Sequence, residues 1–284
     1  MSTTSQRQRS TVFAVIGFIA LLVAAVLWLV PLALILMNSL KGNLFISQSP
    51  FAVPDSQSYM GLTNYTSGAA RTGFFKAAGY SLFITIASVA VIIVVTSMAA
   101  WYIARVKAWY TSVLYYLLVF SMIVPFQMVM FTMSKVANMT HLDNPLGIIV
   151  LYAGFGAGLS VFICVGFVRS IPIEIEEAAM IDGASPWQVF FQVIFPILRP
   201  TIITIAILNA MWVWNDYLLP YLVIGTQYQT IPIAVQRYMQ GSYGQKDMGG
   251  FMAMLVLAII PIIVFYLTSQ KYIIKGVAAG AVKG

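Results

Sequence analysis

The side chains that could do chemistry in this 284-residue chain are few. It contains one histidine (His141), one cysteine (Cys164) and eight acidic residues. A histidine and a cysteine on separate segments supply neither an activated nucleophile nor the ligand set of a zinc site. The phosphate-binding pattern G-x-x-x-x-G-K-[ST] is absent as well. The sequence therefore predicts a protein that is not an enzyme and that carries no metal or cofactor of its own.

The acidic residues are concentrated in one segment, residues 169–200. It holds four of the eight, namely Glu174, Glu176, Glu177 and Asp182. Three glutamates within four residues suit the first turn of a helix, where the helix dipole favours negative charge. Gly183 follows, and glycine tolerates the left-handed backbone that commonly ends a helix. A short acidic helix that stops at Gly183 is expected.

A second helix is expected to begin directly after this stop. In Ser185-Pro186-Trp187-Gln188, the serine is a good N-cap, the proline suits the first helical position and the glutamine completes a capping box. We expect this helix to end at Pro196. Residues 169–200, here called the elbow, thus form two helices with a bend. The residues alone leave two interpretations open: a surface that docks another protein, or a passive linker along the membrane.

The composition identifies the setting of these residues. Hydrophobic residues make up 61% of the chain and charged residues 8%, with a mean hydropathy of +0.90; soluble domains average about 25% charged. Five runs of 23 to 31 uncharged residues lie between charges, and residues 201–224 form a sixth apolar run that only Asp216 interrupts. A spanning helix needs about 20 residues. The prediction is an all-α polytopic membrane protein with six transmembrane helices.

The basic residues suggest an orientation. With six spans, nine of the fifteen lie on the side of the termini and six on the other, which favours cytoplasmic termini. We therefore expect residues 1–10 to be a cytoplasmic N-terminus, 11–270 the six-helix domain with the elbow as a cytoplasmic loop, and 271–284 a cytoplasmic tail. The net charge of +7 fits this bias and an anionic lipid surface, so no nucleic-acid partner is expected.

The elbow also carries a recognisable motif. Glu177-Ala178-Ala179, then Gly183, then Val193-Ile194-Phe195-Pro196 resembles the EAA motif of ABC-importer permeases. The family pattern ends in Ile-x-Leu-Pro, so Val193 and Phe195 depart from it conservatively. Residues 270–284 and Trp214-Asn215-Asp216 are similar to the second permease of carbohydrate importers of the maltose type.

This resemblance implies a fold, a function and a set of partners. The fold would be that of a type I ABC-importer permease in a prokaryotic plasma or inner membrane. The subunit would move a sugar or oligosaccharide by alternating access. It would work with a second permease subunit, an extracytoplasmic solute-binding protein and a dimeric ATP-binding subunit that holds ATP and Mg.

The resemblance also implies which residues meet the ATP-binding subunit. The EAA loop would couple to it through Glu176, Glu177, Ala178, Ala179, Asp182, Gly183 and Pro196. The C-terminal tail would reach it through Gly280, Lys283 and Gly284.

The sequence indicates less clearly which residues would contact the sugar or the binding protein that delivers it. Polar or aromatic residues within the spans could line a substrate path: Gln127, Asn209, Trp214, Asn215 and Asp216. Each could instead bond a neighbouring helix, and Asp216 could anchor a helix end. In the external loop, residues rich in hydrogen bonds and stacking faces could contact the binding protein: Gln236, Tyr238, Gln240 and Tyr243. The alternative for these is an ordinary solvated loop.

A different class of transporter remains the alternative. A stand-alone secondary transporter or channel would carry charged residues within several spans. Asp216 is the only charged residue within the predicted spans, which weakens the alternative of a stand-alone transporter or channel.

Overall fold

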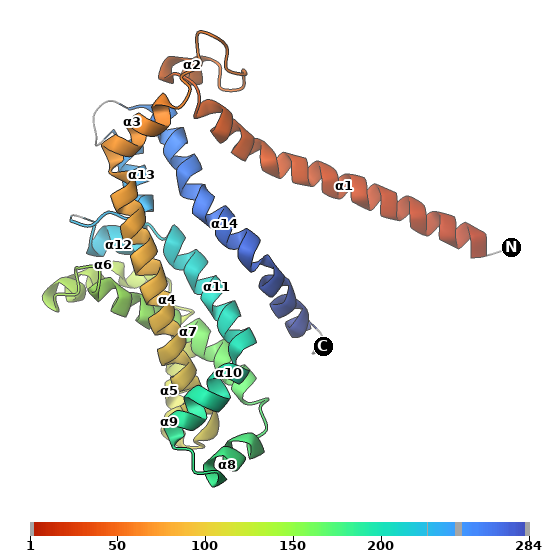
Figure 1. The fold of residues 1–284 in the computed structure, drawn as a ribbon, viewed down its shortest axis with the longest axis vertical. Helices are drawn as coiled ribbons and strands as arrows, with labels where there is room; N and C mark the ends of the chain where they lie inside the picture. Colours follow the sequence, from red (N-terminus) through yellow and green to blue (C-terminus); the bar gives the residue numbers. More distant parts are fainter. Residues whose placement is uncertain (1–2, 226, 242–245, 282–284) are drawn as a thin grey trace. The chain divides into compact units, whose positions relative to one another are not determined.

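The structure is a computed structural model that describes residues 3–225, 227–241 and 246–281. Within these residues all regular structure is helical, apart from an isolated bridge between Lys41 and Tyr59. The predicted all-α class is confirmed. In chain order (Figure 1) the helices are α1 (Thr3–Asn38), α2 (Asn43–Gln48), α3 (Thr63–Thr72), α4 (Phe74–Arg105), α5 (Trp109–Ser121), α6 (Phe126–Met139), α7 (Gly147–Val168), α8 (Glu174–Ile181), α9 (Pro186–Gln188), the π-helical turn η1 (Val189–Ile194), α10 (Phe195–Ile197), α11 (Arg199–Asn215), α12 (Leu218–Val223), α13 (Ile231–Met239) and α14 (Met248–Ala281).

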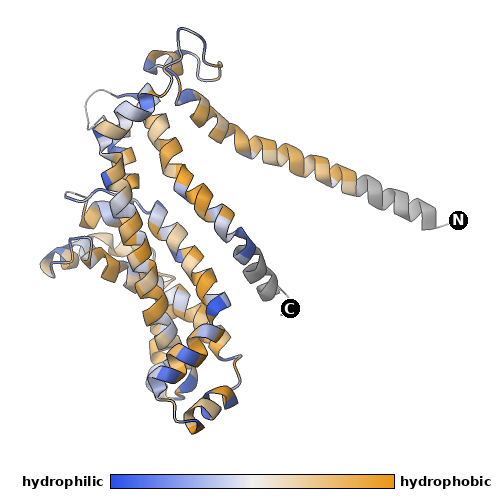
Figure 2. Cartoon of the chain, in the orientation of Figure 1, coloured by the Kyte–Doolittle hydropathy of each residue, from blue (hydrophilic) through white to orange (hydrophobic). Residues whose placement is uncertain are grey.

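Among the described residues, four helical stretches are long and apolar enough to cross a membrane on their own. They are Ala14–Asn38, Phe74–Arg105, Gly147–Val168 and Met248–Tyr272, and Figure 2 shows α1, α4 and α14 as largely apolar where they are coloured. Two bent helix pairs bring the number to six if each pair is one span. The predicted number of six spans is therefore obtained only if each bent helix pair is counted as one broken span.

The first bent pair lies in the predicted third span. The uncharged run there was expected to form one helix, but α5 and α6 meet at an angle of 106°. Pro125 lies at the break with an extended backbone (φ −61°, ψ 134°). Proline offers no N–H to the helix ladder and disfavours a helical conformation in the residue before it, so the chain turns sharply here.

The predicted fifth span is also interrupted. α11 ends at Asn215, because Asp216 adopts an extended conformation (φ −73°, ψ 123°), and α12 begins two residues later. At its other end, α11 meets the helical segment Pro186–Ile197 at 76°. Residues 201–224 are therefore one long helix followed by a short one, joined at the single acidic residue of the run.

The chain divides into two compact units, residues 1–72 with 235–259 and residues 73–234 with 260–284. In the first unit, buried polar groups tie the loops together. The Asn64 side-chain amide donates to the carbonyls of Ser39 and Lys41, at 2.8 Å each. The Lys41 amine, 1% exposed as a residue, donates to the carbonyl of Ser49 at 3.1 Å.

In the second unit, α7 packs along α4, α5 and α11. Small residues permit close approach: a Cβ on Gly156 would lie 2.8 Å from both the Ile92 side chain and Asn209 Oδ1. A Cβ on Gly158 would lie 2.6 Å from the carbonyl oxygen of Leu118. One buried cluster holds the elbow to the ends of these helices; its members are Val168, Ile171, Val189, Phe190, Ile194 and Leu198.

Candidate functional site

The first arm of the elbow is α8, and it ends as expected at Gly183. This glycine has a left-handed φ of +87°. Its amide donates to the carbonyl of Met180, and the amide of Ala184 donates to that of Ala179, both at 3.0 Å. These two bonds are those of a Schellman motif, which satisfies the last carbonyls of the helix and reverses the chain.

The second arm begins with the predicted capping box. The Ser185 hydroxyl accepts from the Gln188 amide at 3.4 Å, and the Gln188 side chain accepts from the Ser185 amide at 2.8 Å. Pro186 occupies the first helical position. Because the Schellman motif and the capping box are adjacent, local hydrogen bonds define the bend between the two arms.

The end of the second arm differs from the expectation. Pro196 was predicted to end the helix, but α9, η1 and α10 continue to Ile197, and the break falls at Leu198. Pro196 has no N–H to donate to the carbonyl of Gln192, and its ring crowds the preceding turn. The wider π-helical turn over Val189–Ile194 relieves this crowding without ending the helix.

A buried ion pair fastens the first arm to α4. The Glu176 side chain is 5% exposed, and its Oε1 lies 2.6 Å from Arg105 Nη2 and 2.7 Å from Arg105 Nε. Its other oxygen accepts from the Trp101 indole N–H at 2.9 Å. Arg105 also donates to the carbonyl of Ile171 at 3.0 Å. All of these groups lie where α4 ends, so α8 and the end of α4 form one charged joint.

Most of the neighbouring predicted residues of the elbow are exposed. Glu177, Ala178, Asp182, Gly183 and Pro196 are exposed, while Ala179 is half-buried against the apolar cluster. Large apolar side chains are exposed around them: Met180, Ile181, Trp187 and Phe191. Ile181 is 85% exposed. We call Glu177, Met180, Ile181 and Trp187 the elbow tip. An apolar surface of this kind next to a carboxylate is typical of a protein-binding site.

The geometry of the bend gives a test of its own. Replacing Gly183 with alanine should lower the free energy of unfolding by about 1–2 kcal/mol, because a Cβ disfavours the left-handed backbone. A steric clash does not contribute, since nothing lies within 4 Å of the Cβ position. Thermal unfolding of the purified chain measures this.

Gly166→Ala is the matched control for that substitution. Gly166 lies within α7, has no positive φ and also has free space around its Cβ position. Alanine there should leave stability unchanged or raise it. Equal effects at the two positions would mean that the bend does not depend on the left-handed residue.

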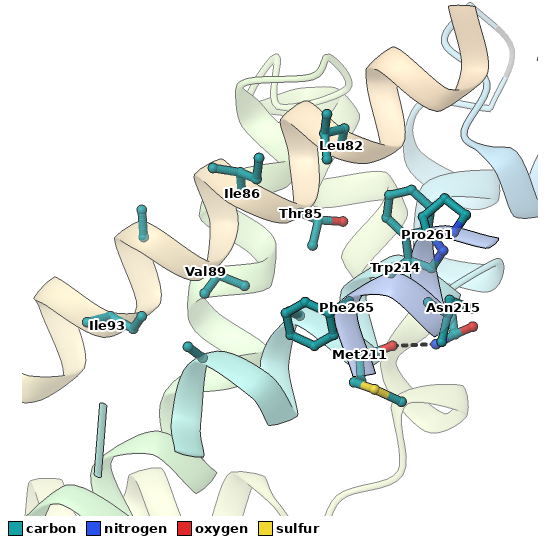
Figure 3. Close-up of a pocket in the computed structure, with 14 residues that line it drawn as sticks. Leu82, Thr85, Ile86, Val89, Ile93, Met211, Trp214, Asn215, Pro261 and Phe265 are labelled. Atoms are coloured by element: carbon teal, nitrogen blue, oxygen red, sulfur yellow. Dashed lines mark hydrogen bonds between the residues drawn. The ribbon is translucent and has the colours of Figure 1, made fainter. Parts of the chain in front are cut away.

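A largely apolar cavity of about 460 Å³ lies between α4, α11 and residues 261–265 of α14. Two of the predicted path residues, Trp214 and Asn215, line it. Figure 3 shows them near Phe265 and Pro261, across from Thr85 on α4. The Asn215 side-chain amide donates to the Met211 carbonyl at 2.7 Å, and its oxygen forms no hydrogen bond with the part of the chain that the structure describes. The cavity therefore offers an aromatic face and few polar groups.

The other predicted path residues are engaged elsewhere or lie apart. The buried Asn209 donates to Ser160 Oγ at 3.1 Å and to the Ile205 carbonyl at 2.9 Å, so it holds α11 to α7. Asp216 accepts from the Tyr152 hydroxyl at 3.1 Å and from the amide of Leu218 at 3.0 Å, at the start of α12. These contacts match the helix-anchoring alternative. Gln127 is exposed at the start of α6.

The predicted loop and tail residues are only partly described. Tyr238 is 4% exposed, so its ring does not face the surface, whereas Gln236 is half-buried and Gln240 is exposed. Gly280 lies in α14. Tyr243, Lys283 and Gly284 lie outside the described residues.

Tyr238 has a structural partner. Its hydroxyl donates to Asp247 Oδ2 at 2.9 Å, and Arg71 lies 3.8 Å from the same oxygen. Burial and the hydrogen bond to Asp247 raise the pKa of Tyr238 from 10 to about 12. A raised native pKa means that this stabilisation is complete below pH 10 and is lost as the pH rises through about 12.

Tyr238→Phe should therefore lower the free energy of unfolding by about 1–3 kcal/mol at neutral pH, because Asp247 loses a donor. The difference from the unchanged chain should shrink between pH 10 and about 12. Thermal unfolding over a pH series measures both effects. Tyr59→Phe, at a tyrosine that is 58% exposed, is the control and should change little. A Tyr238 effect that persists at high pH would contradict this assignment.

Comparison with known proteins places this arrangement in a family. The "probable starch degradation products transport system permease protein AmyC" of Thermoanaerobacterium thermosulfurigenes is 36% identical over 263 residues, which cover 92% of this chain and 94% of the relative. The "multiple sugar-binding transport system permease protein MsmG" of Streptococcus mutans is 34% identical, over 94% of this chain and 96% of the relative.

A solved structure supports the same fold. A chain of a bacterial ABC transporter involved in the import of the acidic polysaccharide alginate aligns with a TM-score of 0.78 at 21% identity, over 93% of this chain and 97% of that one. The family described as "Binding-protein-dependent transport system inner membrane component" matches residues 96–279, which include the elbow and its charged joint. The chain is therefore a multi-pass membrane protein that belongs to this family of importer permeases.

Proposed function

We propose that this chain is a permease subunit of an ATP-driven importer of a sugar or oligosaccharide, coupled to a separate ATP-binding subunit through the elbow. The observation that carries the proposal is the elbow: a bend set by local hydrogen bonds, a buried charged joint to α4 and an exposed apolar tip. A surface that is rigidly attached to the spans can move them when its partner moves, which alternating access requires.

The two faces of the elbow have different roles in this proposal. The elbow tip, with Glu177 and Ile181, meets the ATP-binding subunit on the cytoplasmic side. Glu176 does not reach the surface and instead positions the elbow by holding Arg105. ATP and Mg belong to the partner subunit, a second permease completes the path, and an extracytoplasmic protein delivers the substrate.

Carbohydrate is the proposed substrate class because relatives that align over nearly the whole chain carry names of sugar transport systems. Trp214 and Asn215 are the proposed path residues, since both line the cavity of about 460 Å³. An aromatic face and an amide oxygen are groups that recognise sugars. No specific observation favours a stand-alone transporter or channel.

Reconstituted transport tests this proposal. The chain is placed in liposomes with its partner subunits and a binding protein loaded with each of a panel of mono- and oligosaccharides. ATP-dependent uptake of at least one sugar is expected. Uptake that persists without the ATP-binding subunit would contradict the proposal and favour the stand-alone alternative.

A further inference from the structure

A second cavity lies at the end of the bundle that carries the elbow. It measures about 640 Å³ and is formed where α4 ends, where α5 begins and where α7 ends. Its lining includes three cations, Arg105, Lys107 and Arg169, and no acidic residue. A cavity with this lining attracts an anion.

The cations differ in how they are engaged. Arg105 is held by Glu176 in the charged joint. The Arg169 guanidinium lies over the Tyr115 ring, 5.6 Å from its centroid, and within the described part of the chain it forms no ion pair. Lys107 is exposed and likewise has no carboxylate partner among the described residues. Two positive charges at the cavity are therefore not neutralised by any carboxylate of the described residues.

The start of α5 adds to this preference. Trp109 and Thr111 belong to the first turn of this 13-residue helix and line the cavity, while the amide of Ser112, which also lines it, donates to the carbonyl of Ala108 at 3.3 Å. The first amides of a helix have no acceptor within it, and the helix dipole is positive at that end. Together with the two cations, these groups suit a phosphate oxygen.

An apolar groove continues from the cavity along the same helix. It measures about 480 Å³ and shares Tyr116 with the cavity. Its other lining residues follow one another along α5 and just beyond its end: Val113, Leu117, Val119, Phe120 and Ile123. Trp109 and Tyr116 are 79% and 69% exposed, and exposed aromatic residues at a span end are typical of the headgroup level of a membrane.

We propose that the cavity and groove form a binding site for an anionic phospholipid, with the headgroup phosphate between Lys107, Arg169 and the start of α5 and an acyl chain along the apolar groove. The groove is what distinguishes a lipid from a free phosphate compound, because a soluble anion would make no use of it. Basic pockets between spans that bind anionic headgroups are a known means of lipid recognition.

The test measures lipid affinity of the purified full-length chain in neutral detergent. Phosphatidylglycerol should bind at least about tenfold more tightly than phosphatidylcholine. A Lys107→Gln and Arg169→Gln double variant should lose about tenfold in affinity for phosphatidylglycerol, with phosphatidylcholine unaffected. Both side chains are exposed, so the fold should tolerate the change. Arg199→Gln, at an exposed cation outside the cavity, is the control and should bind normally.

Two further measurements distinguish a phospholipid from a free anion as the ligand of the cavity. Tyr116→Ala should weaken phosphatidylglycerol binding, and millimolar inorganic phosphate should fail to compete. If phosphate competes and Tyr116→Ala has no effect, the site binds a free anion and the lipid proposal is wrong. The proposal is also overturned if the double variant binds lipid normally but releases the ATP-binding subunit, because the cavity is then a protein contact.

Discussion

Arg105→Met should abolish sugar uptake while the ATP-binding subunit still binds the chain and hydrolyses ATP. The substitution leaves Glu176 as a carboxylate that is 5% exposed, with the Trp101 indole as its remaining side-chain partner. Breaking a buried ion pair on one side costs about 3–5 kcal/mol. That cost falls on the attachment of α8 to α4, whereas the elbow tip itself is unchanged. Uptake and ATP hydrolysis of the reconstituted complex, measured together, give the coupling ratio.

A double variant shows whether the effect of Arg105→Met on stability comes from the unpaired charge of Glu176. Arg105→Met combined with Glu176→Leu removes both charges, and replacing a buried pair by apolar residues is often neutral or stabilising. The double variant should recover the thermal stability that Arg105→Met loses. Trp101→Phe keeps a ring against Phe190 and removes the indole donor, so its effect should be smaller, about 1–3 kcal/mol. Full uptake by Arg105→Met would show that the joint does not transmit motion.

Ile181→Arg at the elbow tip should leave the stability of the fold nearly unchanged but abolish binding of the ATP-binding subunit. Ile181 is 85% exposed and makes little contribution to the fold, so stability should change by less than about 0.5 kcal/mol. An exposed apolar residue at the centre of an interface can contribute about 2–4 kcal/mol to binding. The ATP-binding subunit should therefore be lost when the complex is extracted in detergent, and ATP-dependent uptake with it.

The matched control for this variant is Met139→Arg. Met139 is 69% exposed at the end of α6, and its neighbour Ala137 belongs to the buried cluster of Ile84 and Ile148, at the other end of α4 and α7 from the elbow. The control should retain the ATP-binding subunit. Loss from both variants would point to general instability of the complex and not to a docking surface at the elbow.

The sequence predicted the elbow closely because its bend depends on neighbouring residues. Gly183, Ser185 and Gln188 act through hydrogen bonds that span a few positions, and all three take the predicted conformations. The prediction that the second helix ends at Pro196 was wrong, because a π-helical turn accommodates the proline within the helix. Residue spacing alone does not reveal such a turn. Local rules therefore determine where a segment bends more reliably than where it ends.

Long-range contacts explain what the sequence left undecided. Glu176 and Glu177 are adjacent and chemically alike, and only the position of Arg105, 71 residues away, makes one buried and the other exposed. Tyr238 was likewise assigned to the surface because its partners Asp247 and Arg71 come from other segments. The proline at position 125 itself indicates a break in the helix, but the long uncharged run around it favoured the prediction of one continuous span.

Site-specific cross-linking tests the central claim, that the elbow tip docks the ATP-binding subunit, most directly. A photoreactive amino acid is placed at Ile181 in one sample and at Met139 in another, in the assembled complex. A covalent adduct with the ATP-binding subunit is predicted from position 181 and none from position 139. An adduct from position 139 but not from 181, in a complex that still transports sugar, would contradict the account.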